Sequence, residues 1–104
     1  MKVKIKDIEI DIVEKENSKE VYINDSEWQI GVFSLVDCKI YLHRRIDKTL
    51  KYQALIHELA HAFIHIYNID ISDEENICDF MSIYCKDIIN IADRYFKEIA
   101  GNEK

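Results

Sequence analysis

Two histidines and a glutamate share one short segment of the chain, His57-Glu58-Leu59-Ala60-His61. Residues four apart on an α-helix lie on one face, about 6 Å from each other, so the two imidazoles can converge on one ion. Glu58 lies about a quarter-turn round the helix from His57, and its carboxylate can reach a water beside the ion without being a ligand itself. The spacing predicts metal ligands at His57 and His61 and a general base at Glu58.

Zinc is the metal that this arrangement favours. Zinc lowers the pKa of a bound water to about 7, and a carboxylate base then makes that water a nucleophile at neutral pH. The alternative is a pair of core histidines that only pack and hydrogen-bond. It leaves Glu58 as a nearly buried carboxylate with no Arg or Lys adjacent in sequence, which is energetically costly. We therefore expect one zinc ion per chain.

A catalytic zinc site needs a third protein ligand, and the candidates are acidic residues near the start of a second helix. Glu75 is the preferred third ligand, with Asp79 and Glu74 as alternatives. If Glu75 binds the metal, Asp79 lies on the same face and can orient a ligand histidine. Glu75 also has a competing structural role, because Ser72-Asp73-Glu74-Glu75 matches a helix capping box.

The elements that must position these residues come in the order strands, then helices. Alternation of apolar and charged residues over 3–13 predicts a strand with a bulge or bend near Lys6–Asp7. Shorter strands are expected at 21–23, 28–33 and 39–43. The first 46 residues are thus mainly strands.

Helical spacing of apolar residues begins at Asp47, the expected N-cap, and predicts a helix over 47–67 that carries the motif. A second helix is expected over 72–100. The whole chain, 1–104, then forms one α+β domain, with a small antiparallel or mixed sheet of about three to four strands packed beside two long helices.

Apolar residues predict how these elements pack. The helix over 47–67 is apolar almost all the way round, so we expect it to be buried on most sides. The second helix carries a main apolar stripe and a narrower stripe of small residues that would face the first helix; the main stripe is Ile77, Met81, Tyr84, Ile88, Tyr95 and Ile99, and the narrower one is Cys78, Ser82, Cys85 and Ile89. Trp28 and Phe33 are expected core anchors, and Cys78 and Cys85 are expected to be buried.

Two further groups of residues lie near the motif. Tyr41 and His43 belong to the strand before the motif helix, where they either line a substrate cleft or stay on the surface. His65 continues the ladder of histidines, but it lies about 12 Å along the helix from His57. It cannot share one ion with His57, and we expect it to be partly exposed at the helix end.

Charge and cysteine content limit the partners. A net charge of −6 over 104 residues argues against nucleic acid, whose phosphates need clustered Lys and Arg. The three cysteines are an odd number without a CxxC pair, which argues against a disulfide framework. No apolar run resembles a signal peptide or reaches the roughly 20 residues that cross a bilayer. We expect a cytoplasmic protein with reduced thiols and no membrane partner.

The segment from about Ile40 to Phe96 resembles the small phage- and mobile-element-associated metallopeptidases of the ImmA/IrrE type, which have a zincin-like fold. The matching residues are Ile40-Tyr41-Leu42 before the helix, Leu55 to Phe63 around the motif, and Glu75-Asn76-Ile77-Cys78-Asp79 in the second helix. The resemblance implies zinc ligands at His57, His61 and Glu75, a general base at Glu58, and cleavage of proteins such as repressors. Cys78 departs from the alanine usual in the family.

These observations together predict a zinc-dependent metallopeptidase that hydrolyses a peptide bond in a protein or peptide substrate, with Glu58 as general base. The alternative is a catalytically silent zincin-fold protein that binds a regulatory protein partner. A structural zinc is a third possibility, which a closed site with four protein ligands would distinguish.

Overall fold

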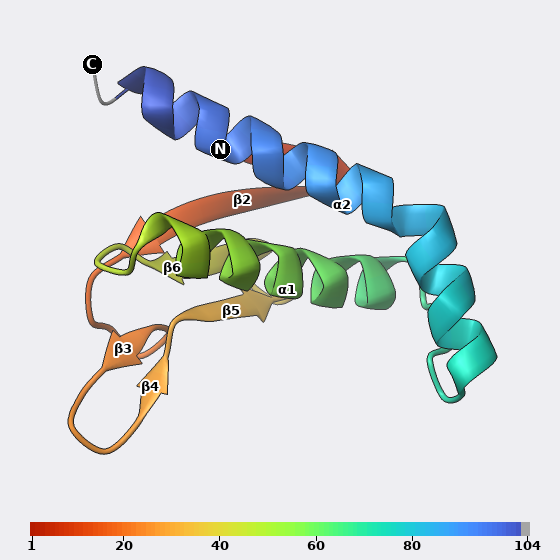
Figure 1. Ribbon diagram of the computed structural model, residues 1–104, viewed down its shortest axis with the longest axis horizontal. Helices are drawn as coiled ribbons and strands as arrows, with labels where there is room; N and C mark the ends of the chain where they lie inside the picture. The colour runs from red at the N-terminus through yellow and green to blue at the C-terminus, as the bar shows by residue number, and fades with distance from the viewer. Residues whose placement is uncertain (103–104) are drawn as a thin grey trace.

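The chain folds into a mixed β-sheet and two helices, seen in a computed structural model that describes residues 1–102, with side chains described through residue 99 (Figure 1). The main sheet contains β1 (Lys2–Ile5), β2 (Ile8–Lys15), β5 (Gly31–Ser34) and β6 (Lys39–His43). Their order across the sheet is β1-β2-β6-β5; of the neighbouring pairs, β2 and β6 are parallel and the other two are antiparallel. β3 (Tyr22–Ile23) and β4 (Trp28–Gln29) form a separate two-stranded ribbon. The α+β class and the four-stranded sheet are confirmed.

The predicted single strand over 3–13 is two strands joined by a tight turn. Lys6 adopts a positive φ of 57°, a left-handed conformation that turns the chain between β1 and β2. Ile5 then pairs with Ile8, and Val3 with Ile10, in antiparallel register. The slip in the alternation near Lys6–Asp7 is therefore a hairpin turn, not a bulge.

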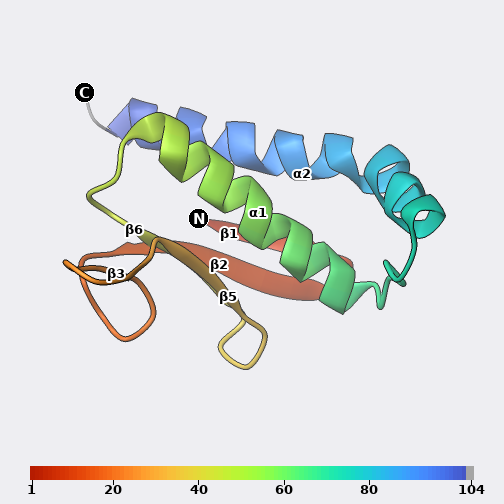
Figure 2. The same ribbon diagram turned by 60° about the horizontal axis from the view of Figure 1, so that its bottom comes forward.

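Helix α1 (Lys48–Ile66) begins as predicted, because the Asp47 carboxylate accepts a hydrogen bond from the Leu50 backbone N–H at 2.8 Å. α1 lies across one face of the sheet (Figure 2). Its residues Leu55, Leu59 and Ala62 are fully buried against that face. The sheet contributes alternate residues to the same core, namely Ile10, Ile12, Ile40 and Leu42. Each such side chain stabilises the fold by about 1.5–3 kcal/mol.

Helix α2 (Glu74–Asn102) starts two residues later than predicted. Asp73, and not Ser72, is its cap, because the Asp73 carboxylate accepts a hydrogen bond from the Asn76 backbone N–H at 2.9 Å. The predicted capping box is therefore wrong, and Glu75 does not cap the helix. Glu75 is exposed to solvent in the first turn of the helix.

α2 packs antiparallel to α1 through a stripe displaced from the predicted one. Phe80, Ile88, Ala92 and Tyr95 are buried, whereas Ile77 and Met81 are exposed. The displacement has an aromatic cause: the rings of Phe80 and Phe63 both lie 5.7 Å from the ring of Tyr84, and that of Tyr67 lies 5.0 Å from it. Large rings on this face occupy the interface in place of the small residues.

The predicted narrow stripe consequently faces solvent. Cys78, Ser82, Cys85 and Ile89 are all exposed, so the expectation that the cysteines are buried is wrong. The first turns of α2 extend beyond the C-terminal end of α1 in both views (Figures 1 and 2). Among residues 1–102, no helix or strand covers this face of those turns.

The face of the sheet opposite α1 is covered by the chain between β2 and β4. Tyr41 and His43 point to this side, because Ile40 and Leu42 alternate with them and point to α1. His43 is 3 % exposed, and its Nε2 lies 2.7 Å from the side-chain oxygen of Asn17. The prediction that Tyr41 and His43 lie on the surface is therefore wrong, and neither residue lines the pocket that contains His57 and Glu58, although His43 borders a separate hollow. Within residues 1–102, no helix is long and apolar enough to cross a membrane.

Candidate metal centre

The two motif histidines point their ring nitrogens at each other from the exposed side of α1. The Nε2 atoms of His57 and His61 lie 3.2 Å apart, and the ring centroids lie 4.8 Å apart. Two ligands of a tetrahedral zinc ion, each about 2.0–2.1 Å from the metal, lie about 3.3 Å from each other. The spacing of the two nitrogens thus fits one edge of a zinc coordination shell.

Glu58 lies beside this pair but on the buried side of the helix. Its side chain contacts Gly31 of β5, where an added Cβ would lie 3.3 Å from the Glu58 Cγ and 3.5 Å from one carboxylate oxygen. Glu58 is 8 % exposed, and burial raises the pKa of its carboxyl above the usual range. The charged forms of His57 and His61 and the backbone N–H of Phe33 oppose that rise in pKa.

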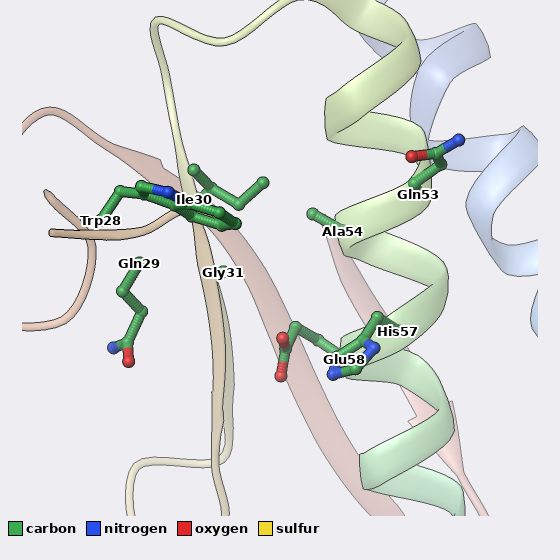
Figure 3. Close-up of a pocket in the computed structure, with 8 residues that line it drawn as sticks. All are labelled: Trp28, Gln29, Ile30, Gly31, Gln53, Ala54, His57 and Glu58. Atoms are coloured by element: carbon green, nitrogen blue, oxygen red, sulfur yellow. The ribbon is translucent and has the colours of Figure 1, made fainter. Parts of the chain in front are cut away.

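A pocket of about 370 Å³ opens between α1 and the chain that passes from β4 into β5 (Figure 3). Gln53, Ala54, His57 and Glu58 line its helix side, and Trp28, Gln29, Ile30 and Gly31 line its strand side. Figure 3 shows the Trp28 indole and Ile30 at one end of this opening, with Glu58 and His57 at the other. The predicted general base and one predicted ligand therefore share a solvent-accessible pocket.

β5, and not the strand 39–43, forms the edge of the sheet at this pocket. β6 is paired on both sides, by β2 and by β5, whereas β5 pairs with β6 alone within residues 1–102. The outer backbone groups of β5 thus have no strand partner there, although one of them, the Phe33 N–H, faces the Glu58 carboxylate. β5 runs in the same direction as α1, since Gly31 contacts Glu58 while the ring of Phe33 stacks 6.2 Å from that of His65.

His65 is exposed at the end of α1, as predicted. Its ring lies 6.5 Å from that of His61, so the three histidines form a ladder along the open side of the helix. The prediction that α1 is buried on most sides holds for its core side only.

The predicted third ligand lies away from this pair of histidines. Tyr52 donates a hydrogen bond to Asp93, and Phe63 packs against Tyr84, so the α2 residues level with His61 are close to 85. Glu75 lies about ten residues before that level, which is about 15 Å along the helix axis. Among the residues that the structure describes, no three His, Cys, Asp or Glu side chains are grouped to hold one metal ion.

Two residues of the pocket were not singled out from the sequence as functional. Gly31 permits the close approach of Glu58 to β5, and a glycine inside a strand is a known signal of such an approach. Trp28 was expected in the core, but it is 68 % exposed at the mouth of the pocket. Phe33 is half-buried against His65. Nothing in the spacing of apolar residues distinguishes such a tryptophan from a core anchor.

In comparisons with known proteins, no family model, no curated protein and no solved structure matches this chain. The resemblance to the ImmA/IrrE-type metallopeptidases therefore rests on the motif residues alone and stays a prediction.

Proposed function

We propose that this protein is a zinc-dependent metallopeptidase that hydrolyses a peptide bond in a protein or peptide substrate. One observation carries the proposal: the His57 and His61 Nε2 atoms converge to 3.2 Å beside a buried glutamate, at a pocket bounded by β5, an edge strand of the sheet among the described residues. A pair of core histidines would bury both rings, whereas these rings lie on the exposed side of α1.

His57 and His61 would hold the zinc ion through Nε2, with Glu75 as third ligand. When bound, zinc supplies a Lewis acid that polarises the scissile carbonyl and lowers the pKa of a water molecule to about 7. Glu58 accepts the proton of the attacking water on its carboxylate and returns it to the amine nitrogen as the peptide bond breaks. Contact with Gly31 and burial against β5 keep that carboxylate in one orientation.

The substrate would bind as an extended strand along β5. The outer edge of β5 offers backbone carbonyl groups and the Gly31 N–H, and an added strand gains affinity from main-chain hydrogen bonds without requiring a particular sequence. The Glu58 carboxylate lies at this strand, within reach of the Phe33 backbone N–H. A peptide on this edge would therefore pass beside both the base and the histidines.

Glu75 can serve as third ligand only if the first turns of α2 approach His61. Those turns extend past the end of α1 and expose Ile77 and Met81, but the movement would have to displace the buried ring of Phe80. Asp79 and Glu74 lie in the same turns and are the alternative ligands. Binding of the metal would supply the free energy that orders this segment.

The test is elemental analysis together with digestion of a peptide library by the purified, zinc-loaded protein. We expect about one zinc per chain, lost in His61→Ala and in Glu75→Ala but retained in Glu98→Ala, a control on the distant half of α2. Cleavage should stop when a chelator removes the metal and return when zinc is restored.

The possible failures separate the candidate functions. Retention of zinc in Glu75→Ala alone would transfer the third ligand to Asp79 or Glu74. Zinc bound without hydrolysis would favour the catalytically silent protein that binds a regulatory partner. Absence of metal after reconstitution would overturn the metallopeptidase.

A further inference from the structure

The single tryptophan of the chain borders a second hollow beside the catalytic pocket. This hollow of about 290 Å³ has an almost wholly apolar wall, formed by Ile23, Trp28, Ile30, Ile46 and Leu50. Trp28, Ile23 and Leu50 all expose large apolar surface there, although a core position would bury it. Clustered exposed apolar side chains around a tryptophan are typical of a binding surface.

The hollow is continuous with the pocket of the candidate metal centre. Trp28 and Ile30 line both, and Figure 3 shows these two residues at the end of the pocket away from His57 and Glu58. This continuity identifies the occupant. A chain that crosses the catalytic pocket along β5 would reach the hollow next, without leaving the surface of the protein.

The distance between the apolar hollow and the candidate metal centre determines which substrate residue enters the hollow. Leu50 precedes His57 by seven residues of α1, which is about 10.5 Å along the helix axis. An extended peptide advances about 3.3 Å per residue, so about three residues separate the two places.

The direction of β5 sets on which side of the scissile bond that residue lies. β5 runs from Gly31, beside Glu58, to Phe33, beside His65. An antiparallel partner, which makes the more stable ladder, runs the opposite way. It would pass His65 first, then Glu58, and reach Trp28 with its C-terminal part.

We infer that the apolar hollow is a specificity site for a large apolar side chain, such as Leu, Ile, Met or Phe, about three residues to the C-terminal side of the cleaved bond. This inference rests on the proposed function and deepens it, since it states the class of polypeptide that the enzyme selects. Burial of one such side chain against Trp28, Ile30 and Leu50 discriminates against small or charged residues at that substrate position.

The first experiment maps cleavage sites in a proteome-derived peptide library by mass spectrometry. The zinc-loaded protein should enrich large apolar residues at or next to the third position after the cleaved bond. Trp28→Ala should lose that enrichment, and its kcat/KM should fall about tenfold more for such peptides than for peptides with alanine at that position. Ile83→Ala, on the exposed side of α2 and 62 % exposed, is the matched control and should behave as the unaltered protein.

Two outcomes of this experiment would overturn the specificity site while leaving the peptidase intact. One is cleavage with no apolar preference on the C-terminal side of the bond. The other is a preference that persists unchanged in Trp28→Ala. Complete absence of cleavage by the zinc-loaded protein would instead overturn the proposed function. The second experiment would then test separately whether the hollow binds an apolar side chain.

The second experiment uses the fluorescence of Trp28, the only tryptophan, in the Glu58→Gln variant. A capped heptapeptide of alanine with one central phenylalanine, at millimolar concentration, should shift the emission to shorter wavelength, and the all-alanine peptide should not. Equal responses to both peptides, or none, would overturn the hollow as an apolar binding site. A blue shift produced by raising the protein concentration alone would assign the hollow to a second copy of the chain and would also overturn the inference.

Discussion

Two partly or wholly buried carboxylates, Glu58 and Glu14, lie at different levels along the axis of α1 and have very different partners. Glu14 of β2 accepts a hydrogen bond from Lys51 of α1 at 3.0 Å and another from the Tyr95 hydroxyl of α2. It thereby joins three elements through fixed polar contacts. Glu58 instead faces two imidazoles and a pocket, and burial raises the pKa of its carboxyl.

The difference separates a carboxylate whose contacts hold the fold together from a carboxylate that borders an open pocket. A carboxylate tied to a cation and a hydroxyl is satisfied, and its charge is offset where it stands. A carboxylate that is desolvated beside an open pocket keeps free lone pairs for a proton. The same residue type therefore serves structure at one end of α1 and, in our proposal, catalysis near its middle.

The largest expected effect comes from removing the charge of Glu58. Glu58→Gln should lower hydrolysis by about 10³-fold, because amide replaces the base that accepts the proton of the attacking water. Bound zinc and the thermal unfolding midpoint should change little, since the amide retains the shape of the side chain. Elemental analysis, thermal melts and initial rates measure the three quantities, and full activity of a zinc-replete variant would remove Glu58 as the base.

The reverse experiment removes the charge of Glu14. Glu14→Gln should leave the rate per folded, zinc-loaded molecule unchanged and lower the free energy of unfolding by about 2–3 kcal/mol, because Lys51 is left largely buried without its counter-charge. Denaturant unfolding measures the loss.

The control for this change is Glu16→Gln, whose partner Arg45 is exposed. It should cost less than about 1 kcal/mol. Equal losses for the two variants would show that the Glu14 contacts contribute no more than a surface ion pair.

A smaller effect is expected from crowding Glu58 without altering it. In Gly31→Ala the new methyl group would meet the Glu58 Cγ at 3.3 Å, closer than ordinary van der Waals contact. Displacement of the carboxylate should lower kcat about tenfold while zinc content stays at one per chain. Ser34→Ala, at the other end of β5, is the control; a Gly31→Ala protein with unchanged kcat would show that this contact does not position the base.

The smallest expected effect is a loss of folding stability at alkaline pH, which arises from Tyr95 and its hydrogen bond to Glu14. Burial and the hydrogen bond to Glu14 raise the pKa of the Tyr95 hydroxyl far above its usual value near 10. The folded protein keeps this proton while the unfolded chain releases it, so Tyr95 destabilises the folded state as the pH rises above about 10. The contribution should be about 1 kcal/mol between pH 10 and 11.

Denaturant unfolding of the unaltered protein and of Tyr95→Phe at these two pH values isolates the contribution of Tyr95. The unaltered protein should lose more stability over this interval than the variant. Parallel pH dependences in the two proteins would contradict the raised pKa.

The local elements could be predicted from the sequence because their causes are local. Asp47 caps α1 through a hydrogen bond to the backbone N–H of Leu50, only three residues away. The four-residue spacing of His57 and His61 brings their ring nitrogens together on any regular helix. Alternating residues such as Ile40 and Leu42 identified the strand that is buried against α1. The role of Glu58 as general base stays a prediction from its position in the motif; the structure shows only that its side chain is buried beside the histidines.

The edge strand of the sheet and the register of α2 could not be predicted, because both depend on neighbours that are distant in sequence. β5 and not β6 became the sheet edge because β2 pairs in parallel with β6, a contact across about 30 residues that no periodicity encodes. The register of α2 was decided by aromatic rings of Phe63, Phe80 and Tyr84, and this register determines how far Glu75 lies from His61.

The positions of Gly31 and Trp28 at the pocket also depend on contacts between elements that are distant in sequence. A glycine and a tryptophan can each occupy many places in a fold, and only the packing of β5 against α1 makes one the contact of Glu58 and the other an exposed wall of the pocket. The sequence by itself determined the chemistry that α1 can carry, because helix geometry converts spacing into proximity. The tertiary structure decided which side of α1 is open, which strand borders it and what a substrate would meet there, because burial and pairing depend on the whole chain.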